Sequence, residues 1–332
     1  MTGSAAGRMV SAAEVARHLQ SQSRILVVSH ESPDGDALGC LSGFMLLCEQ
    51  LGIACTAYIP GQGPLPPEYL FLPRVGDIAR GELPPIEPGT AVYFFDCASL
   101  LRCDSLPDDQ PMTRVNVDHH QDNPCYAELN LIDPTAPSST AILYDIIKAG
   151  GFKVDQPMAT ALYVGLVTDT GRFQYSNTTP GAHRMAAELQ EVGLDVNTIY
   201  RLVYESTPLP KLRLLERALC HLEVRLNGAL VTSWLDNEDF LKAAAQEGHA
   251  EGIIDTLRRI HGVRVAALAR ASSRDGKPET KVSLRSTDGS VNVAALAALQ
   301  GGGGHTRAAG FTSAEDLATV LRWIEQQVEA SL

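Results

Sequence analysis

Four apolar runs of strand length recur in the first half of the chain, and their recurrence constrains the fold more than any other feature. Enough residues separate successive runs for a helix or another crossover connection. Strands that alternate with such connections form a parallel sheet, and parallel sheets carry helices on both faces. We therefore expect an α/β fold with a parallel sheet built from residues 24–29, 53–59, 91–95 and 114–117.

The chain has 332 residues, which exceeds the usual size of one domain, so two domains are expected. Helical patterns at residues 139–149, 158–168 and 182–191 complete the first domain. A polar, helix-prone stretch interrupted by Pro208 and Pro210 then reads as a connector. Beyond it, further strand candidates alternate with helices at residues 222–226, 229–234, 263–271 and 280–286. We predict a first domain at residues 1–190, a helical linker at 191–220, and a smaller α+β domain at 221–332.

Net charge narrows the classes of protein to which the chain can belong. Its 27 Lys and Arg residues stand against 39 Asp and Glu residues, which gives a formal net charge of −12. Such a balance argues against a protein that coats long duplex DNA by neutralising many phosphates. Binding of a short nucleic acid or another small anion is compatible with this net charge, because a few cations in a cleft suffice to bind it.

Neither the cysteines nor the apolar segments indicate export or a membrane. The seven cysteines include no CxxC pair, so no disulfide framework or zinc ribbon is indicated, and a reducing cytosol fits. The first residues lack the apolar region of a signal peptide. The most apolar helical stretch, residues 37–51, contains Glu49 and is too short to cross a bilayer. We expect a cytoplasmic protein without membrane association.

Polar side chains of one chemical type follow the strand candidates where they end. The first run is followed by His30, Asp34 and Asp36, the third by Asp96, and the fourth by Asp118, His119 and His120, while Asp169 ends an apolar helix. A lone Asp at such a position is most often a turn former or a helix N-cap. The joint pattern favours a site instead, because ligands bind beyond the carboxyl ends of the strands in open α/β sheets.

Convergence of these residues would crowd the carboxylates of Asp34, Asp36, Asp96 and Asp169 together. Like charges a few ångströms apart do not all stay ionised without compensation, and two divalent cations would supply it. Carboxylate and imidazole ligands without thiolate suit Mn²⁺, with Mg²⁺, Co²⁺ and Fe²⁺ as competitors. Two such metals are the usual device for hydrolysing phosphate esters.

The second domain carries a glycine run and a local excess of positive charge. Between Arg258 and Arg307 there are nine Lys or Arg residues and three acidic residues. A solvated surface is the simpler interpretation for scattered members such as Lys277. Arg285, in an alternating strand, and Arg307, just past the glycines, are better candidates for binding an anion. Glycines let backbone N–H groups approach a phosphate, to which His305 and Arg307 would add charge-assisted donors.

The motifs themselves resemble those of the DHH-family phosphoesterases. The segments HESPDGDALG, YFFDCAS, VNVDHHQDN and GLVTDTGRF match four motifs of that family in order and spacing. The segment GGGGHTRAAGF is similar to the substrate motif of the family's second domain. Together these segments span residues 30–311, and their combination is far more specific than any one of them.

The resemblance implies a role for each position. One metal would be held by His30, Asp34 and Asp96, and the other by Asp36, Asp96, His119 and Asp169. Asp118 would orient His119, and His120 would donate a hydrogen bond to the scissile phosphate. The substrate's phosphate and base would be bound by Arg285, Gly302, Gly303, Gly304, His305 and Arg307, on a surface that closes over the metals.

The resemblance is to the compact two-domain branch of the family, whose members often form homodimers through the first domain. That branch degrades oligoribonucleotides of a few residues, dephosphorylates 3′-phosphoadenosine 5′-phosphate, and in some members cleaves cyclic dinucleotides. Three alternatives stay open: a single-strand DNA exonuclease of the same family, an inorganic pyrophosphatase, and a catalytically inactive nucleotide-binding module. The exonucleases usually carry an additional domain, the pyrophosphatases lack the glycine and histidine motif, and an inactive module would have damaged ligands.

Overall fold

The computed structural model describes residues 7–103, 106, 112–274 and 277–332, and it divides into two compact units, Met1–Ser206 and Thr207–Leu332. The first unit contains a seven-stranded sheet with the order β1-β7-β6-β5-β2-β3-β4, and every neighbouring pair is parallel. Its strands are β1 (Arg8–Met9), β2 (Arg24–Val28), β3 (Ala54–Ile59), β4 (Ala79–Arg80), β5 (Ala91–Phe95), β6 (Arg114–Asp118) and β7 (Leu129–Ile132). The predicted parallel α/β fold is confirmed.

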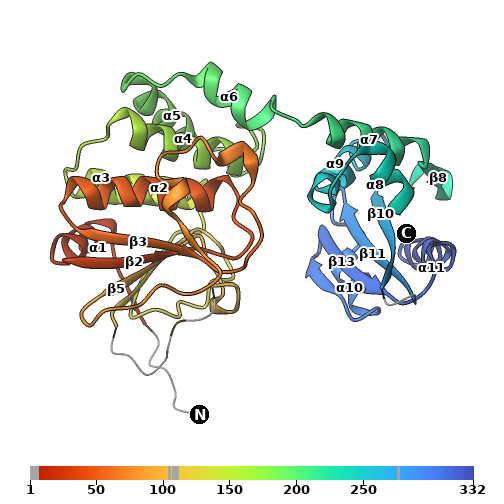
Figure 1. Ribbon diagram of the computed structural model, residues 1–332, viewed down its shortest axis with the longest axis horizontal. Coiled ribbons are helices and arrows are strands. Elements are labelled where there is room, and N and C mark those ends of the chain that lie inside the picture. The colour runs from red at the N-terminus through yellow and green to blue at the C-terminus, as the bar shows by residue number, and fades with distance from the viewer. Residues whose placement is uncertain (1–6, 104–105, 107–111, 275–276) are drawn as a thin grey trace, which may run out of the picture. The chain divides into compact units, whose positions relative to one another are not determined.

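The helices of this unit lie on one side of the sheet, in more than one layer (Figure 1). Nearest the strands are α1 (Ala12–Gln20), α2 (Gly35–Gln50) and α3 (Ser139–Ala149), and beyond them lie α4 (Gln156–Asp169), α5 (Pro180–Glu191) and α6 (Val196–Tyr204). Strand side chains alternate between two cores, as the period of a strand requires. Ile25 and Val27 pack with the helices, whereas Leu26 and Val28 point to the opposite face.

On the opposite face, the part of the chain that the structure describes shows no α-helix, which differs from the prediction of helices on both sides. The core on that face contains Leu26, Val28, Tyr58, Val92 and Phe94, and it is packed with side chains from connecting segments such as Leu83, Ile86 and Leu100. The connections around β4 and β5 contain short 3₁₀ turns, including η3 (Leu100–Arg102), where the parallel pattern suggested crossover helices. For the connection between β3 and β5, the proline-rich sequence accounts for this, because proline interrupts helices.

The second unit contains a six-stranded mixed sheet with the order β12-β13-β11-β10-β9-β8. Its strands are β8 (Glu223–Arg225), β9 (Leu230–Leu235), β10 (Val265–Arg274), β11 (Lys277–Ser286), β12 (Gly303–His305) and β13 (Ala308–Ser313). Its helices are α7 (Leu209–Cys220), α8 (Asn237–Ala243), α9 (Ile253–Leu257), α10 (Val293–Ala298) and α11 (Leu317–Glu329). Separate hydrophobic clusters form its core, so this unit is the α+β arrangement expected from the sequence.

The segment between the units belongs partly to each of them. Ile199 of α6 is buried in the core of the first unit. Leu214 and Ala218 of α7 are buried in the core of the second unit. The division between Ser206 and Thr207 therefore falls between two helices that each pack on their own side.

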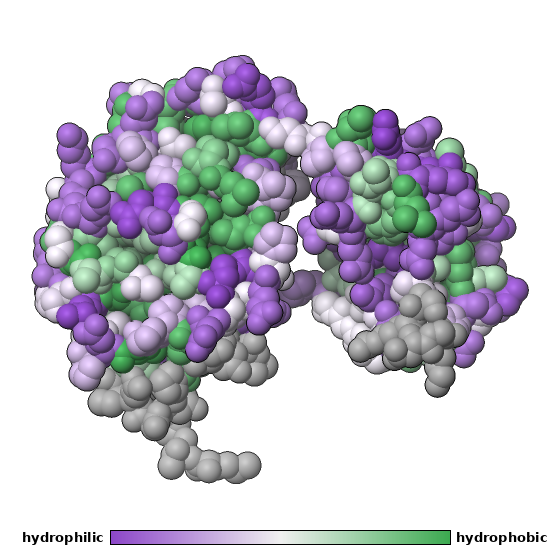
Figure 2. Space-filling model, in the orientation of Figure 1, coloured by the Kyte–Doolittle hydropathy of each residue, from purple (hydrophilic) through white to green (hydrophobic). Residues whose placement is uncertain are grey.

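Two further sequence-based expectations bear on the surface and the cysteines. In the described residues, no helix is both long and apolar enough to cross a membrane, and Figure 2 shows hydrophilic residues spread over the visible face of each unit, between hydrophobic patches.

The cysteine pattern indicated no disulfide framework, but Cys97 and Cys103 form a disulfide. These two residues are six apart, and their pairing depends on the turn that η3 makes between them.

Candidate metal centre

The turn after β2 positions three of the predicted ligands, His30, Asp34 and Asp36. Ser29 donates from its hydroxyl to the Phe95 carbonyl oxygen at 2.9 Å, which ties the carboxyl ends of β2 and β5 together. Asp34 caps the amino terminus of α2 and accepts a hydrogen bond from the Asp36 backbone N–H at 3.0 Å. Such caps form because the first N–H groups of a helix have no partner within it. The Asp-rich turn is thus a helix cap and also part of the site.

Asp96 follows β5, which lies between β2 and β6 in the sheet. Its backbone φ is 56°, in the left-handed region that non-glycine residues seldom adopt and that Asp tolerates better than most. A hydrogen bond from its backbone N–H to the Val117 carbonyl oxygen, at 3.1 Å, holds it to the end of β6. Unfavourable backbone conformations of this kind cluster at functional sites.

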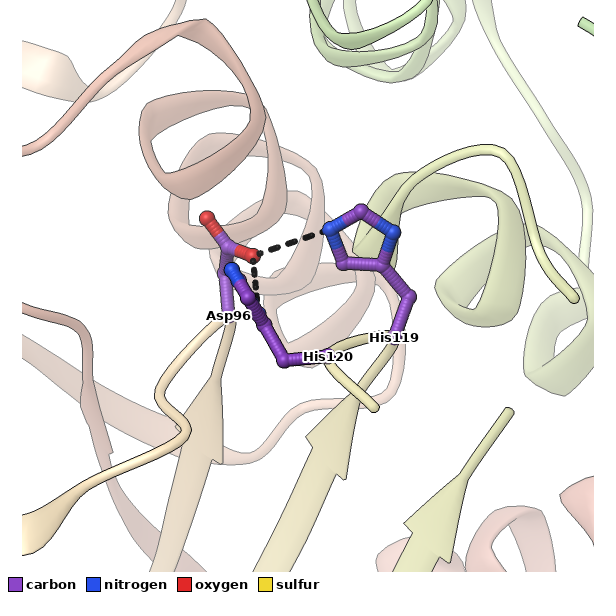
Figure 3. A group of neighbouring side chains, drawn as sticks. All are labelled: Asp96, His119 and His120. Atoms are coloured by element: carbon purple, nitrogen blue, oxygen red, sulfur yellow. Dashed lines mark ion pairs between the residues drawn. The ribbon is translucent and has the colours of Figure 1, made fainter. Parts of the chain in front are cut away.

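The six predicted metal ligands and His120 come together at this edge of the sheet. They form three overlapping groups whose ligand atoms lie within 4.8 Å of one another: His30, Asp34 and Asp96; Asp36, His119 and Asp169; and Asp96, His119 and His120. Figure 3 shows the Asp96 carboxylate facing both imidazoles, with Oδ1 at 3.7 Å from His119 Nε2 and 3.7 Å from His120 Nδ1. Asp96 is therefore placed to belong to two groups at once.

Burial raises the pKa of Asp36 and Asp169, and so does the repulsion among crowded carboxylates that the sequence predicts. Burial, together with the charges of Asp96 and Asp169, raises the pKa of Asp36 well above its ordinary value. Burial and the charges of Asp96 and Asp34 raise the pKa of Asp169 to about 8. Burial opposes the ionisation of Asp96 too, but the facing imidazole of His30 and the imidazoles of His120 and His119 lower its pKa. A site of this composition fits divalent cations, which would relieve the repulsion among the carboxylates.

The amino terminus of α3 binds two of these carboxylates. Backbone N–H groups of Ser139 and Thr140 donate to Asp36 at 2.6 and 3.0 Å, and the Thr140 hydroxyl donates at 2.7 Å. The Ser139 hydroxyl donates to Asp96 Oδ1 at 3.1 Å. Helix amino termini favour negative charge, and such outer hydrogen bonds orient metal ligands. These residues were not among the predicted site residues, although a Ser-Ser-Thr run at a helix start is a recognisable signal.

Asp118, at the end of β6, is fully buried and holds His120. Its Oδ1 accepts from His120 Nδ1 at 2.7 Å, and its Oδ2 accepts from the Asn123 side chain at 2.6 Å. The expected partner was His119, whose backbone N–H alone reaches Asp118, at 2.8 Å. The hydrogen bond to Asp118 raises the pKa of His120 to about 9, so His120 is a cationic donor at neutral pH. No sequence signal singled out Asn123.

Asp169 is the last residue of α4, and Asn177 holds it in place. The Asn177 side-chain amide donates to the Asp169 carbonyl oxygen at 3.1 Å and to the Pro137 carbonyl oxygen at 2.8 Å. Pro137 directly precedes Ser138, the N-cap of α3. Asn177 thus links the end of α4 to the helix start that binds Asp36, a role that depends on tertiary contacts and left no trace in the sequence pattern.

The predicted substrate residues of the second unit lie around the β12–β13 hairpin. Gly303, Gly304 and His305 form β12, and Gly304 has a φ of 138°. A side chain at Gly302 would have its Cβ 2.2 Å from the Gly310 carbonyl oxygen. Close strand pairing therefore requires Gly302 and Gly304 locally, whereas a Cβ at Gly303 would meet nothing within 4 Å.

The two candidate arginines lie at the same end of this hairpin. Arg285 on β11 pairs with Ala308 on β13, the residue directly after Arg307. The Arg285 Nε lies 3.2 Å from Asp255 Oδ1 on α9, so this guanidinium already has an acidic partner. Arg307 is exposed and donates to the Asp288 carbonyl oxygen at 3.2 Å. The structure brings their backbones together, but it occupies Arg285 with an ion pair.

Matches to known families and proteins cover most of the chain. Residues 24–166 match the DHH family, N-terminal domain, and residues 227–330 match the DHHA1 domain. The bifunctional oligoribonuclease and PAP phosphatase NrnA of Thermus thermophilus is 31% identical over 293 residues, which cover 87% of this chain and 83% of the relative. The protein of the same name from Bacillus subtilis is 25% identical, and the alignment covers 94% of each chain.

A solved structure shares the fold along nearly the whole chain. The exopolyphosphatase-related protein from Bacteroides fragilis superimposes with a TM-score of 0.85 over 96% of this chain and 95% of its own, at 23% identity. This similarity concerns the fold alone.

Proposed function

The chain belongs to the DHH family of phosphoesterases, and on that premise we propose that it hydrolyses the phosphate esters of short nucleotides. The proposed substrates are oligoribonucleotides of a few residues and 3′-phosphoadenosine 5′-phosphate, with cyclic dinucleotides as a further candidate. The observation that carries this proposal is the pair of ligand groups, His30, Asp34 and Asp96 beside Asp36, His119 and Asp169. The names of the relatives from Thermus thermophilus and Bacillus subtilis support the choice of substrate.

The residues of the first unit would divide the chemistry among them. We assign one divalent cation to His30, Asp34 and Asp96 and the other to Asp36, Asp96, His119 and Asp169. When bound, the two cations supply an activated water and offset the charge on the displaced oxygen. His120, held by Asp118, would donate a hydrogen bond to the phosphate as its negative charge develops. Ser139 and Thr140 would keep the carboxylates oriented.

We further propose Mn²⁺ as the preferred ion, because mixed carboxylate and imidazole ligands suit it. The β12–β13 hairpin, with Gly302, Gly303, Gly304, His305 and Arg307, would bind the substrate's phosphate and base, and Arg285 would contribute where it is released from Asp255. A cytoplasmic homodimer, joined through the first unit, completes the proposal. Light scattering of the purified protein would test the dimer.

A substrate panel tests the function directly. Purified protein with Mn²⁺ is incubated separately with an RNA dinucleotide, 3′-phosphoadenosine 5′-phosphate, a cyclic dinucleotide, pyrophosphate and long single-stranded DNA. We expect the dinucleotide and 3′-phosphoadenosine 5′-phosphate to be hydrolysed fastest. Preference for long DNA would indicate the exonuclease, preference for pyrophosphate the pyrophosphatase, and tight binding without turnover an inactive module.

A further inference from the structure

Arg102 contacts a predicted metal ligand from the side opposite the carboxylates. Its Nη2 lies 3.0 Å from Nδ1 of His30, while Nε2 of the same imidazole lies 3.6 Å from Asp96 Oδ2. The Arg102 carbonyl oxygen also accepts from the Glu31 backbone N–H at 3.0 Å. Arg102 therefore binds the His30–Glu31 segment twice. It does so at an exposed position at the end of η3, beside a strongly acidic site.

The chemistry of the guanidinium group determines which tautomer of His30 this contact requires. A guanidinium group only donates hydrogen bonds, so Nδ1 must present its lone pair to Arg102. In a neutral imidazole the hydrogen then sits on Nε2, where it points at Asp96. The contact with Arg102 thus selects the tautomer in which Nε2 is a donor.

Coordination of a cation requires the opposite arrangement. The Nε2 atom faces the carboxylate group, so it is the atom through which His30 would bind a cation, and it needs its lone pair to do so. The hydrogen of the neutral ring then sits on Nδ1, where it would face the N–H groups of Arg102. Two donors do not share a hydrogen bond. The Arg102 contact and coordination by His30 therefore exclude each other.

We propose that Arg102 is a phosphate-binding residue that contacts His30 in the metal-free protein and is released to the substrate when a cation binds. This rests on the function proposed above and adds a residue that no motif singled out. Planar guanidinium groups are well suited to phosphate oxygens. The released group would stay beside the site, because the hydrogen bond from the Glu31 backbone N–H to the Arg102 carbonyl oxygen holds the turn that carries it.

Mutual exclusion makes the binding of cation and phosphate interdependent. In the metal-free protein Arg102 competes with the cation for His30. A phosphate that captures Arg102 removes that competitor and must raise the affinity for the cation, and by linkage the cation must raise the affinity for phosphate by the same factor.

The test is a Mn²⁺ titration, followed by electron paramagnetic resonance of the free ion, with and without inorganic phosphate. Arg102→Met keeps the length of the side chain and removes its donors, whereas Arg102→Lys keeps a cationic donor. Arg74→Gln, on the surface away from the site, is the matched control. We expect Arg102→Met to bind Mn²⁺ roughly tenfold more tightly without phosphate, as for the loss of one charge-assisted hydrogen bond. Phosphate should raise Mn²⁺ affinity in the wild type and in Arg74→Gln, and much less in Arg102→Met.

Nitrogen NMR of the His30 ring gives an independent readout. His30 is identified by its absence in His30→Gln, and diamagnetic Zn²⁺ replaces Mn²⁺. We expect the hydrogen on Nε2 in the metal-free wild type and on Nδ1 after Zn²⁺ is added. A ring with its hydrogen on Nδ1 before metal is added would overturn the proposal.

Two outcomes separate the role of Arg102 from the proposed hydrolysis of nucleotides. Equal Mn²⁺ affinities in the wild type and Arg102→Met, with the same gain from phosphate, would reject the role of Arg102 even if dinucleotides are hydrolysed. Coupling that disappears in Arg102→Met would support that role even if the substrate panel shows no nucleotide hydrolysis.

Discussion

Gly165 of α4 lies so close to Asp36 of α2 that a Cβ on Gly165 would stand 2.7 Å from the Asp36 Oδ1 atom and 2.4 Å from the Thr140 Cγ2 atom. The absence of a side chain at Gly165 is therefore what lets the two helices pack and lets Thr140 bind Asp36. Gly165→Ala should lower Mn²⁺ affinity and the melting temperature, because the contact falls on buried, hydrogen-bonded groups. The clash should outweigh the gain of about 1 kcal/mol that alanine brings in a helix. Calorimetric metal titration and thermal unfolding check this.

Gly43 of α2 provides the matched control for that substitution. A Cβ there would lie 3.5 Å from its nearest neighbour, Leu143 Cδ2, which is ordinary contact. Gly43→Ala should leave Mn²⁺ affinity unchanged and stability unchanged or slightly higher. Similar losses of metal affinity in both variants would mean that helix packing in general, rather than the space beside Asp36, supports the site.

The raised pKa of Asp169 predicts how the stability of the metal-free protein depends on pH. Its pKa of about 8 in the folded state exceeds the ordinary 3.8, so the folded state binds an extra proton between these values. The free energy of unfolding should therefore lose this contribution as pH rises from about 4 to about 8. Asp169→Asn removes the charge. In chelator, the variant should match the wild type near pH 4 and melt at a higher temperature near pH 8.

Added Mn²⁺ should reverse that order, because the wild type gains stability from binding the cation and the variant lacks one ligand. Differential scanning fluorimetry across the pH range measures both effects. An Asp169→Asn variant that is less stable than the wild type at pH 8 in chelator would show that Asp169 is not under charge repulsion.

The predicted ligands were recognisable because their chemistry is visible at the ends of strands. His30, Asp96 and the Asp118–His120 run each follow a strongly apolar strand, and the rule that ligands bind at carboxyl ends then brings them together. The short strands β1, β4, β7 and β12 were missed, since two to four residues leave too little periodicity to detect. The strand β13 was missed as well, although it has six residues.

The residues that support the ligands could not be predicted in the same way. Ser139, Asn123 and Asn177 act through contacts with residues distant in the sequence or across a turn, and these arise only from the tertiary arrangement. The preference of Asp118 for the ring of His120 over that of His119 depends on side-chain orientation at the end of β6. Adjacent positions in a sequence carry no information about such a choice.

Substitution of His119 and substitution of His120 should have different effects. His120→Ala should keep most Mn²⁺ binding and slow the chemical step on the order of a hundredfold, because it removes a donor aimed at developing negative charge. His119→Ala should instead weaken Mn²⁺ binding. Metal titration combined with single-turnover hydrolysis of an RNA dinucleotide distinguishes the two, and loss of Mn²⁺ in His120→Ala alone would reverse the assignment.

Arg307 should affect recognition rather than chemistry. Arg307→Ala should raise the Michaelis constant for an RNA dinucleotide roughly tenfold or more, as expected for the loss of one charge-assisted contact. Hydrolysis of a nitrophenyl phosphate diester, which makes few contacts outside the metal site, should change little. Arg322→Ala, an exposed arginine on α11, serves as the control. Equal losses on both substrates for Arg307→Ala would mean that this residue supports catalysis or folding.

Asp96 is the residue on which the two-metal interpretation depends most, since its carboxylate is shared between ligand groups. Asp96→Ala should nearly abolish activity while leaving the fold intact, because one change removes a ligand from both cations. Circular dichroism confirms folding. A wild-type rate for the folded variant would show that Asp96 is not a ligand of the catalytic cations.

We propose that two divalent cations held by the first unit make the chain a nucleotide phosphoesterase. The most direct measurement is hydrolysis of an RNA dinucleotide to mononucleotides while Mn²⁺ is titrated into chelator-treated protein, with bound Mn²⁺ counted in the same samples. We predict no hydrolysis without metal and a rate that reaches its plateau only as the second Mn²⁺ per chain binds. Full activity in excess chelator, or a plateau at one bound Mn²⁺ per chain, would contradict the claim.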